Sequence, residues 1–166
     1  AGAGLVNQAR RFARAAVDAA TTPTERAEAR LALAGLLAPA ATGAQSADEA
    51  RAAIADAGDD AALVARGTAA LARAHYLAGR FDAAVQPAEE ATAAAAQIGL
   101  EAVALGARAT AFLARRELGE EPDGAEDTER ELVTLASSTP DVETGLWVLT
   151  RLAEWSFRTD LAAGER

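Results

Sequence analysis

The chain of 166 residues carries 25 acidic and 16 basic side chains, a formal charge of -9 at pH 7, and 51% of its residues are hydrophobic. This length suits one domain or a short helical array. The negative charge argues against direct nucleic acid binding, which requires clustered positive charge. No uncharged apolar run approaches the ~18 residues that a membrane span needs, so we expect no membrane partner.

The composition favours helix almost throughout the chain. Alanine accounts for 49 of the 166 residues, whereas aromatic residues account for only 4%. Alanine has the highest helix propensity, and small side chains fill a core only when helices approach closely. The chain has no cysteine, which excludes disulfides and thiolate chemistry and gives no sign of an oxidising compartment. We therefore expect a cytoplasmic, all-α protein.

Capping signals predict where the helices begin. Residues 22–25 read Thr-Pro-Thr-Glu, a capping box with a proline at the first helical position. Residues 46–49 begin with Ser46 and end with Glu49, which repeats the capping box before a third helix. Either Asp59 or Asp60 is suited to cap the fourth helix, and residues 138–141 give one more start signal.

Glycines and prolines predict where the helices end. Pro39 follows the second helix at Ala38, and Gly79 supplies the left-handed residue that ends the fourth. Polar residues predict a longer loop from Glu120 to Asp127. The eight expected helices span about 3–20, 23–38, 47–58, 60–78, 81–98, 100–118, 128–136 and 140–163.

A repeated pattern relates these helices to one another. Small residues that would let two helices cross closely recur 34 residues apart, as Ala50, Ile54, Ala57 and Ala84, Ala88, Ala91. The pair Leu71 and Ala72 matches Leu105 and Gly106 at the same spacing. A period of this length indicates stacked helix pairs rather than a single bundle.

The segment from Leu71 to Ala91 resembles a tetratricopeptide repeat. It contains Leu71 and Ala72, then Tyr76, the turn residue Gly79, Phe81, and the small residues Ala84 and Ala91 seven positions apart. The resemblance is best over 65–98, with weaker copies at 24–58 and 99–137 and a final helix at 140–163. It implies one domain over 1–166, a right-handed superhelix of antiparallel helix pairs that forms an α-solenoid of about eight helices.

A second resemblance concerns the source and role of the chain. Every basic residue is arginine and methionine is absent, a bias that suggests a GC-rich, actinobacterial genome and a segment excised from a larger protein. The wording of residues 27–34 is similar to the helical arrays of actinobacterial multidomain transcription and signalling regulators. That resemblance implies a protein-binding or peptide-binding regulatory domain. The alternatives are a free-standing scaffold or adaptor in an assembly or secretion system, and a small-ligand-sensing domain or α-helical enzyme.

The tetratricopeptide resemblance also implies a binding groove, because the first helix of each pair lines the concave surface in that family. The corresponding residues are Arg66, Ala69, Arg73, Tyr76, Leu77, Val103, Ala107 and Thr110. Spacings of three to four residues predict Arg66, Arg73 and Tyr76 on one stripe, where they would bind a carboxylate or a peptide backbone beside an apolar floor. The alternative is that both arginines pair with acidic neighbours on a solvated face.

Aromatic residues near the carboxyl end form a possible interface. Trp147 and Trp155 lie eight residues apart and share a helical face, with Phe157 close by. Such a face more often packs in a core or against another domain than it holds a ligand. The terminal helices also offer a route to a homo-oligomer.

No catalytic group emerges from the sequence. His75 is the only histidine, and a single helical histidine without a nearby serine, cysteine or lysine is more often structural than catalytic. The glycines fall singly at expected helix ends rather than in a phosphate-binding loop. We therefore expect no enzyme activity, no cofactor and no metal site.

Overall fold

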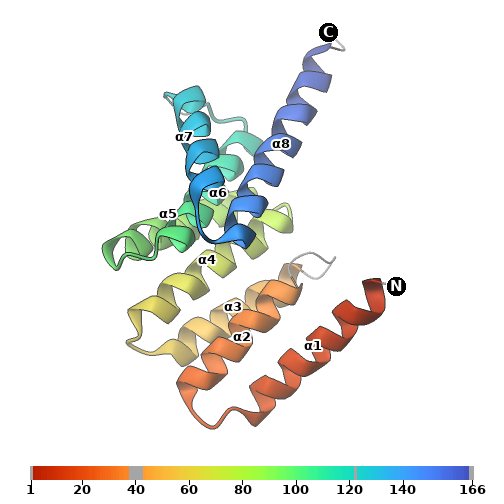
Figure 1. The fold of residues 1–166 in the computed structure, drawn as a ribbon, viewed down its shortest axis with the longest axis vertical. Helices are drawn as coiled ribbons and strands as arrows, with labels where there is room; N and C mark the ends of the chain where they lie inside the picture. Colours follow the sequence, from red (N-terminus) through yellow and green to blue (C-terminus); the bar gives the residue numbers. More distant parts are fainter. Residues whose placement is uncertain (1, 38–42, 122, 165–166) are drawn as a thin grey trace.

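The computed structural model describes residues 2–37, 43–121 and 123–164, and these ranges form eight α-helices without a strand (Figure 1). The helices are α1 Gly2–Ala19, α2 Pro23–Leu37, α3 Gly43–Ala57, α4 Ala61–Leu77, α5 Phe81–Gln97, α6 Glu101–Glu117, α7 Ala125–Ser138 and α8 Val142–Gly164. The expected all-α fold and the expected number of helices are confirmed. None of the described helices is both long enough and apolar enough to cross a membrane.

The even-numbered helices form one layer of the array. Each helix packs against the next in the chain, and α2 also contacts α4, α4 contacts α6, and α6 contacts α8. The described parts of α1, α3, α5 and α7 make no such contacts with one another. Figure 1 shows α1 at one end of this array and α7 and α8 at the other. Because the even-numbered helices approach one another more closely, they line the inner side of the stack.

Two of the predicted caps are confirmed by their hydrogen bonds. Thr22 Oγ1 accepts from the amide of Glu25 at 3.1 Å, and the Glu25 carboxylate accepts from the amide of Thr22 at 3.1 Å. The Asp60 carboxylate accepts from the amides of Ala62 and Leu63, both at 3.0 Å. These bonds satisfy amides that lack a partner within the first turn of α2 and of α4.

The predicted cap at Ser46 is wrong, because α3 begins one turn earlier at Gly43. Ser46 is buried inside the helix, and its hydroxyl donates to the Ala34 carbonyl at 2.9 Å. That carbonyl is among the last four of α2, which have no partner within their own helix. The expected end signal at Ala38 and Pro39 lies outside the described residues.

The predicted loop from Glu120 to Asp127 is too long. Gly124 takes a φ of 71°, and α7 begins directly after it at Ala125 and continues to Ser138, two residues past the expected end. Glu126 and Asp127 therefore lie in the first turn of α7, where acidic side chains favour the positive end of the helix dipole.

The helices recur every 40 or 41 residues rather than every 34. The inner helices α2, α4 and α6 end at Leu37, Leu77 and Glu117, and the left-handed glycines Gly58 and Gly99 are 41 residues apart. A period of 41 exceeds 34 by seven residues, which is about two helical turns. The offset of 34 therefore matched the same buried face of α3 and α5 but not the same level along it.

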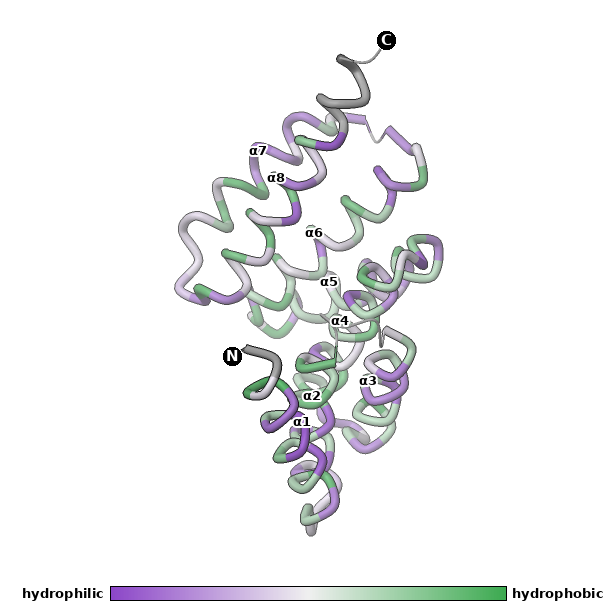
Figure 2. Tube along the Cα trace, turned by 90° about the vertical axis from the view of Figure 1, so that its right-hand side faces the viewer, coloured by the Kyte–Doolittle hydropathy of each residue, from purple (hydrophilic) through white to green (hydrophobic). Residues whose placement is uncertain are grey.

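The main apolar core lies in α4–α8, and smaller clusters hold α1–α3. The main core includes Leu105, Phe112, Leu113, Leu132 and Val148. The small residues expected at the helix crossing, Ala84, Ala88 and Ala91, are fully buried. Figure 2 shows hydrophilic and hydrophobic residues alternating within single helices, including α1 and α8, as expected for helices with one buried face.

Candidate binding groove

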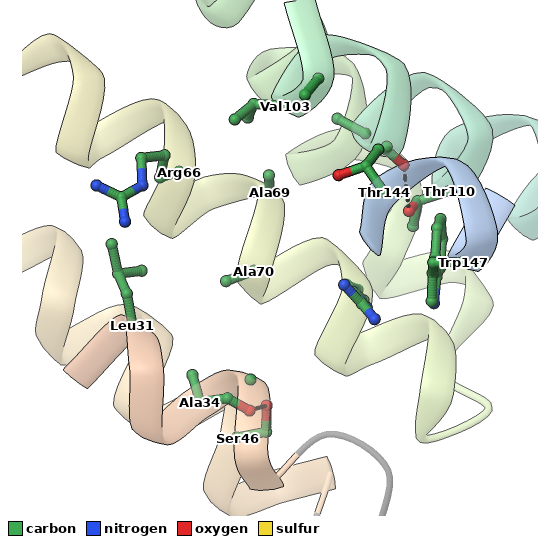
Figure 3. Close-up of a pocket in the computed structure, with 15 residues that line it drawn as sticks. Leu31, Ala34, Ser46, Arg66, Ala69, Ala70, Val103, Thr110, Thr144 and Trp147 are labelled. Atoms are coloured by element: carbon green, nitrogen blue, oxygen red, sulfur yellow. Dashed lines mark hydrogen bonds between the residues drawn. The ribbon is translucent and has the colours of Figure 1, made fainter. Parts of the chain in front are cut away.

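A cavity of about 230 Å³ lies on the inner layer and is lined by residues of α2, α4, α6 and α8, with Ser46 of α3 at its edge. Figure 3 shows Leu31 and Arg66 on one side of it and Thr110, Thr144 and Trp147 on the other. The structure brings together six of the eight groove residues predicted from the sequence: Arg66, Ala69, Arg73, Val103, Ala107 and Thr110.

Small and apolar side chains form most of the floor. Ala69 and Ala70 come from α4, and Val103 and Ala107 come from α6. Thr110 is buried, and its hydroxyl already donates to the Gly106 carbonyl at 2.8 Å. The floor therefore offers an occupant chiefly apolar contacts.

Arg66 is paired within the chain. Its Nη1 and Nη2 donate to the two carboxylate oxygens of Glu28 on α2, at 2.7 and 2.9 Å. Both side chains are partly exposed, so this pair adds little to stability. For Arg66 the alternative weighed above, an ion pair on a solvated face, is therefore the one observed.

Arg73 differs from Arg66 although both lie on α4. Its guanidinium lies over the ring of Trp147, with Cζ 4.8 Å from the centroid. Its Nε is buried without a hydrogen-bond partner, and no ion pair joins Arg73 to an acidic residue in the described ranges. Burial lowers the pKa of Arg73, and the charge of Glu143 opposes that shift. Arginine nevertheless stays protonated in proteins, so Arg73 is an unpaired cation.

Tyr76 and Leu77 do not lie in this cavity, and the predicted stripe is wrong for Tyr76. Three residues advance a helix by about 300°, so Tyr76 is turned by about 60° from Arg73. Its ring is buried and packs on Phe81 with centroids 5.5 Å apart, and burial raises the pKa of its hydroxyl. Tyr76 and Leu77 instead line a second hollow of about 410 Å³ that also contacts α8.

The three aromatic residues predicted as an interface have different environments. Trp147 and Trp155 both pack against the main core, and each is covered by an arginine, Trp155 by Arg116 at 4.2 Å. Phe157 is 65% exposed and lines the second hollow. The sequence placed Trp147 on an interface, but only the packing of α8 beside α4 and α6 brings it to the groove.

His75 lies outside both hollows. It is buried on α4, and Arg80 Nε donates to its Nδ1 at 3.1 Å. Within the described residues, no group of three or more histidine, aspartate or glutamate side chains is placed to hold a metal ion.

The groove therefore combines an apolar floor, a paired arginine and an unpaired arginine held on tryptophan. Its elements come from four helices that are distant in sequence and adjacent in the inner layer. Comparisons of this chain with protein-family models, with curated proteins and with solved structures find no match.

Proposed function

We propose that this chain is a tetratricopeptide-like interaction domain of a larger bacterial regulator and that its inner groove binds a segment of a partner protein. The observation that carries the proposal is the single cavity lined by α2, α4, α6 and α8. A surface that crosses four stacked helices suits an extended or helical peptide, which gains apolar contacts from each helix in turn.

The size of the cavity also favours a peptide. Sites for whole small-molecule ligands enclose roughly 300–1,000 Å³, and this one encloses about 230 Å³. A cavity below that range is suited to one or two anchoring side chains of a longer partner. The rest of the partner would lie along the inner layer.

A bulky residue in the floor tests the proposal. Ala69 lines the cavity and is only partly buried, so Ala69→Phe is expected to fill the space without disturbing the core. Peptides would be selected from a random displayed library on the unaltered chain, and their affinities measured by fluorescence polarisation. We expect Ala69→Phe to weaken binding at least ~tenfold, a loss of ~1.4 kcal/mol.

The matched control is Ala93→Phe, because Ala93 is exposed on the outer helix α5. That variant should bind the selected peptides as the unaltered chain does. Thermal melting of both variants would verify that they fold. If no peptide is enriched, or if Ala69→Phe binds as well as Ala93→Phe, the groove is not the binding surface and the proposal fails.

A further inference from the structure

One end of the groove contains buried nitrogen atoms that lack acceptors. They are Nε of Arg73, Nε1 of Trp147 and Nε of Arg151, and none has a hydrogen-bond partner within the described residues. Trp147 and Arg151 are four residues apart and share one face of α8, while Arg73 reaches Trp147 from α4. Buried N–H groups without acceptors are rare in folded proteins and costly. This end of the groove therefore has a need for an acceptor.

Arg73 is the member of this group that faces the groove with an unused charge. Stacking on an indole engages the face of a guanidinium, whereas carboxylates bind to its N–H donors at the edge. Arg66, two turns earlier on α4, has both terminal nitrogens bound to Glu28, and Arg151 pairs with Glu154 at 2.7 Å. Of the two arginines that line the cavity, only Arg73 has its charge unpaired.

We propose that the Arg73 end of the groove binds a carboxylate joined to an apolar body. The carboxylate would accept hydrogen bonds from Arg73, and the apolar body would lie on Ala69, Val103 and Ala107. This inference rests on the proposed peptide-binding function and specifies the chemistry of the occupant. An acidic side chain of a peptide, a peptide carboxyl terminus and a free carboxylic acid all present this chemistry.

The charges around the site favour a carboxylate over a phosphate. A phosphate group carries about -1.5 to -2 charges and is bound by clusters of arginines. Here a single unpaired guanidinium is available, and Glu143 on α8 contributes a negative charge nearby. Glu143 is exposed and makes no ion pair with Arg73, so its charge opposes a second anion. Glu143→Gln is therefore expected to strengthen carboxylate binding.

A pair of isosteric probes isolates the charge. We would titrate 3-phenylpropionate and its neutral amide, 3-phenylpropanamide, into isotope-labelled chain and follow the backbone amides of Gly106 and Ala107 by NMR. The acid should bind at least ~tenfold more tightly than the amide. Arg73→Gln should abolish that preference. Arg108→Gln removes the same charge from an exposed ion pair with Glu131, which lies outside the groove, and should leave the preference intact.

Each other result overturns the inference. The acid and the amide binding equally, neither binding at about 10 mM, or Arg73→Gln keeping the preference would each exclude a carboxylate subsite at Arg73. Sulfate displacing the acid at the same concentration would show an unselective anion site. Thermal melting would establish that Arg73→Gln is folded.

A second arm separates the possible sources of the carboxylate and separates this inference from the proposed function. Selected peptides would be remade with amidated carboxyl termini, or with glutamine and asparagine in place of acidic residues. Loss of affinity on either change, absent in Arg73→Gln, identifies the group that binds. An Arg73-dependent preference for the acid without any enriched peptide refutes the peptide function alone. Peptides that bind in the groove equally well to Arg73→Gln refute the subsite alone.

Discussion

His75 shows how a single buried side chain can make stability depend on pH. Arg80 Nε donates to its Nδ1 at 3.1 Å, and Arg51 Nη2 lies 3.5 Å from its Nε2. Burial lowers the pKa of His75, as do the charges of Arg80 and Arg51, while Asp82 opposes them. The unfolded chain therefore takes up a proton near pH 6.5 while the folded chain resists it. The contribution of His75 is complete above that pH and is lost as the pH falls toward the lowered pKa.

We expect the melting temperature to fall between pH 7.5 and 5.5 and to fall less in His75→Gln. Glutamine does not titrate, and its side-chain oxygen is able to accept from Arg80. Calorimetry at the two pH values measures the difference. An equal decrease in both proteins would mean that other groups account for the pH dependence.

At the same scale, the sequence predicted where the two groove arginines lie but not their state. Arg66 and Arg73 are seven residues apart and occupy equivalent positions on one helical face. The difference between them comes from partners on other helices, Glu28 on α2 and Trp147 on α8. Helical periodicity contains no information about such partners, so an ion pair and an unpaired cation could not be told apart.

Single elements are packed so closely that one methyl group decides their stability. A Cβ built on Gly145 of α8 would lie 2.6 Å from the carbonyl oxygen of Ala136 on α7. A Cβ on Gly106 of α6 would lie 3.5 Å from Thr144, an ordinary contact. Both glycines are inside helices, where alanine gains about 1 kcal/mol in propensity.

We therefore expect opposite effects from the same substitution. Gly106→Ala should stabilise the chain by up to ~1 kcal/mol, because only the propensity changes. Gly145→Ala should destabilise it by ~1–3 kcal/mol, because a backbone oxygen cannot yield and α7 must move from α8. Urea unfolding measures both. A stabilising Gly145→Ala would show that α7 and α8 are farther apart than described.

Element boundaries were predictable where they depend on local chemistry. The capping box at Thr22 and the aspartate cap at Asp60 act within a few residues of the helix they begin, so their signal is present in the sequence. The start of α3 depends instead on packing. Ser46 is withdrawn from a capping role by the Ala34 carbonyl of another helix, and this interaction has no local signature.

The whole molecule consists of two parts that are stabilised differently. The helices α4–α8 share the main apolar core, whereas α1–α3 hold small clusters and a chain of ion pairs. In that chain Glu49 binds Arg14 at 3.0 Å and Arg30 at 2.7 Å, and Arg30 also binds Asp56 at 2.8 Å. The composition predicted the stacked fold, because alanine-rich helices can bury little except against close neighbours. It could not predict the period of 40 or 41 residues, since a shift of about two turns preserves the same face.

This division predicts that α1–α3 open separately from the rest. In stacked arrays each unit contacts only its neighbours, so a lost contact is felt locally. Glu49 is only 8% exposed, so Glu49→Gln leaves partly buried arginines without a counterion and should raise amide hydrogen exchange in α1–α3 while α5 and α6 keep their protection. The matched change Glu131→Gln breaks an exposed pair with Arg108 and should leave exchange in α1–α3 unaltered. Exchange that rises equally along the chain in Glu49→Gln would instead show one cooperative unit, in which the ion pairs of the first three helices support the groove as well.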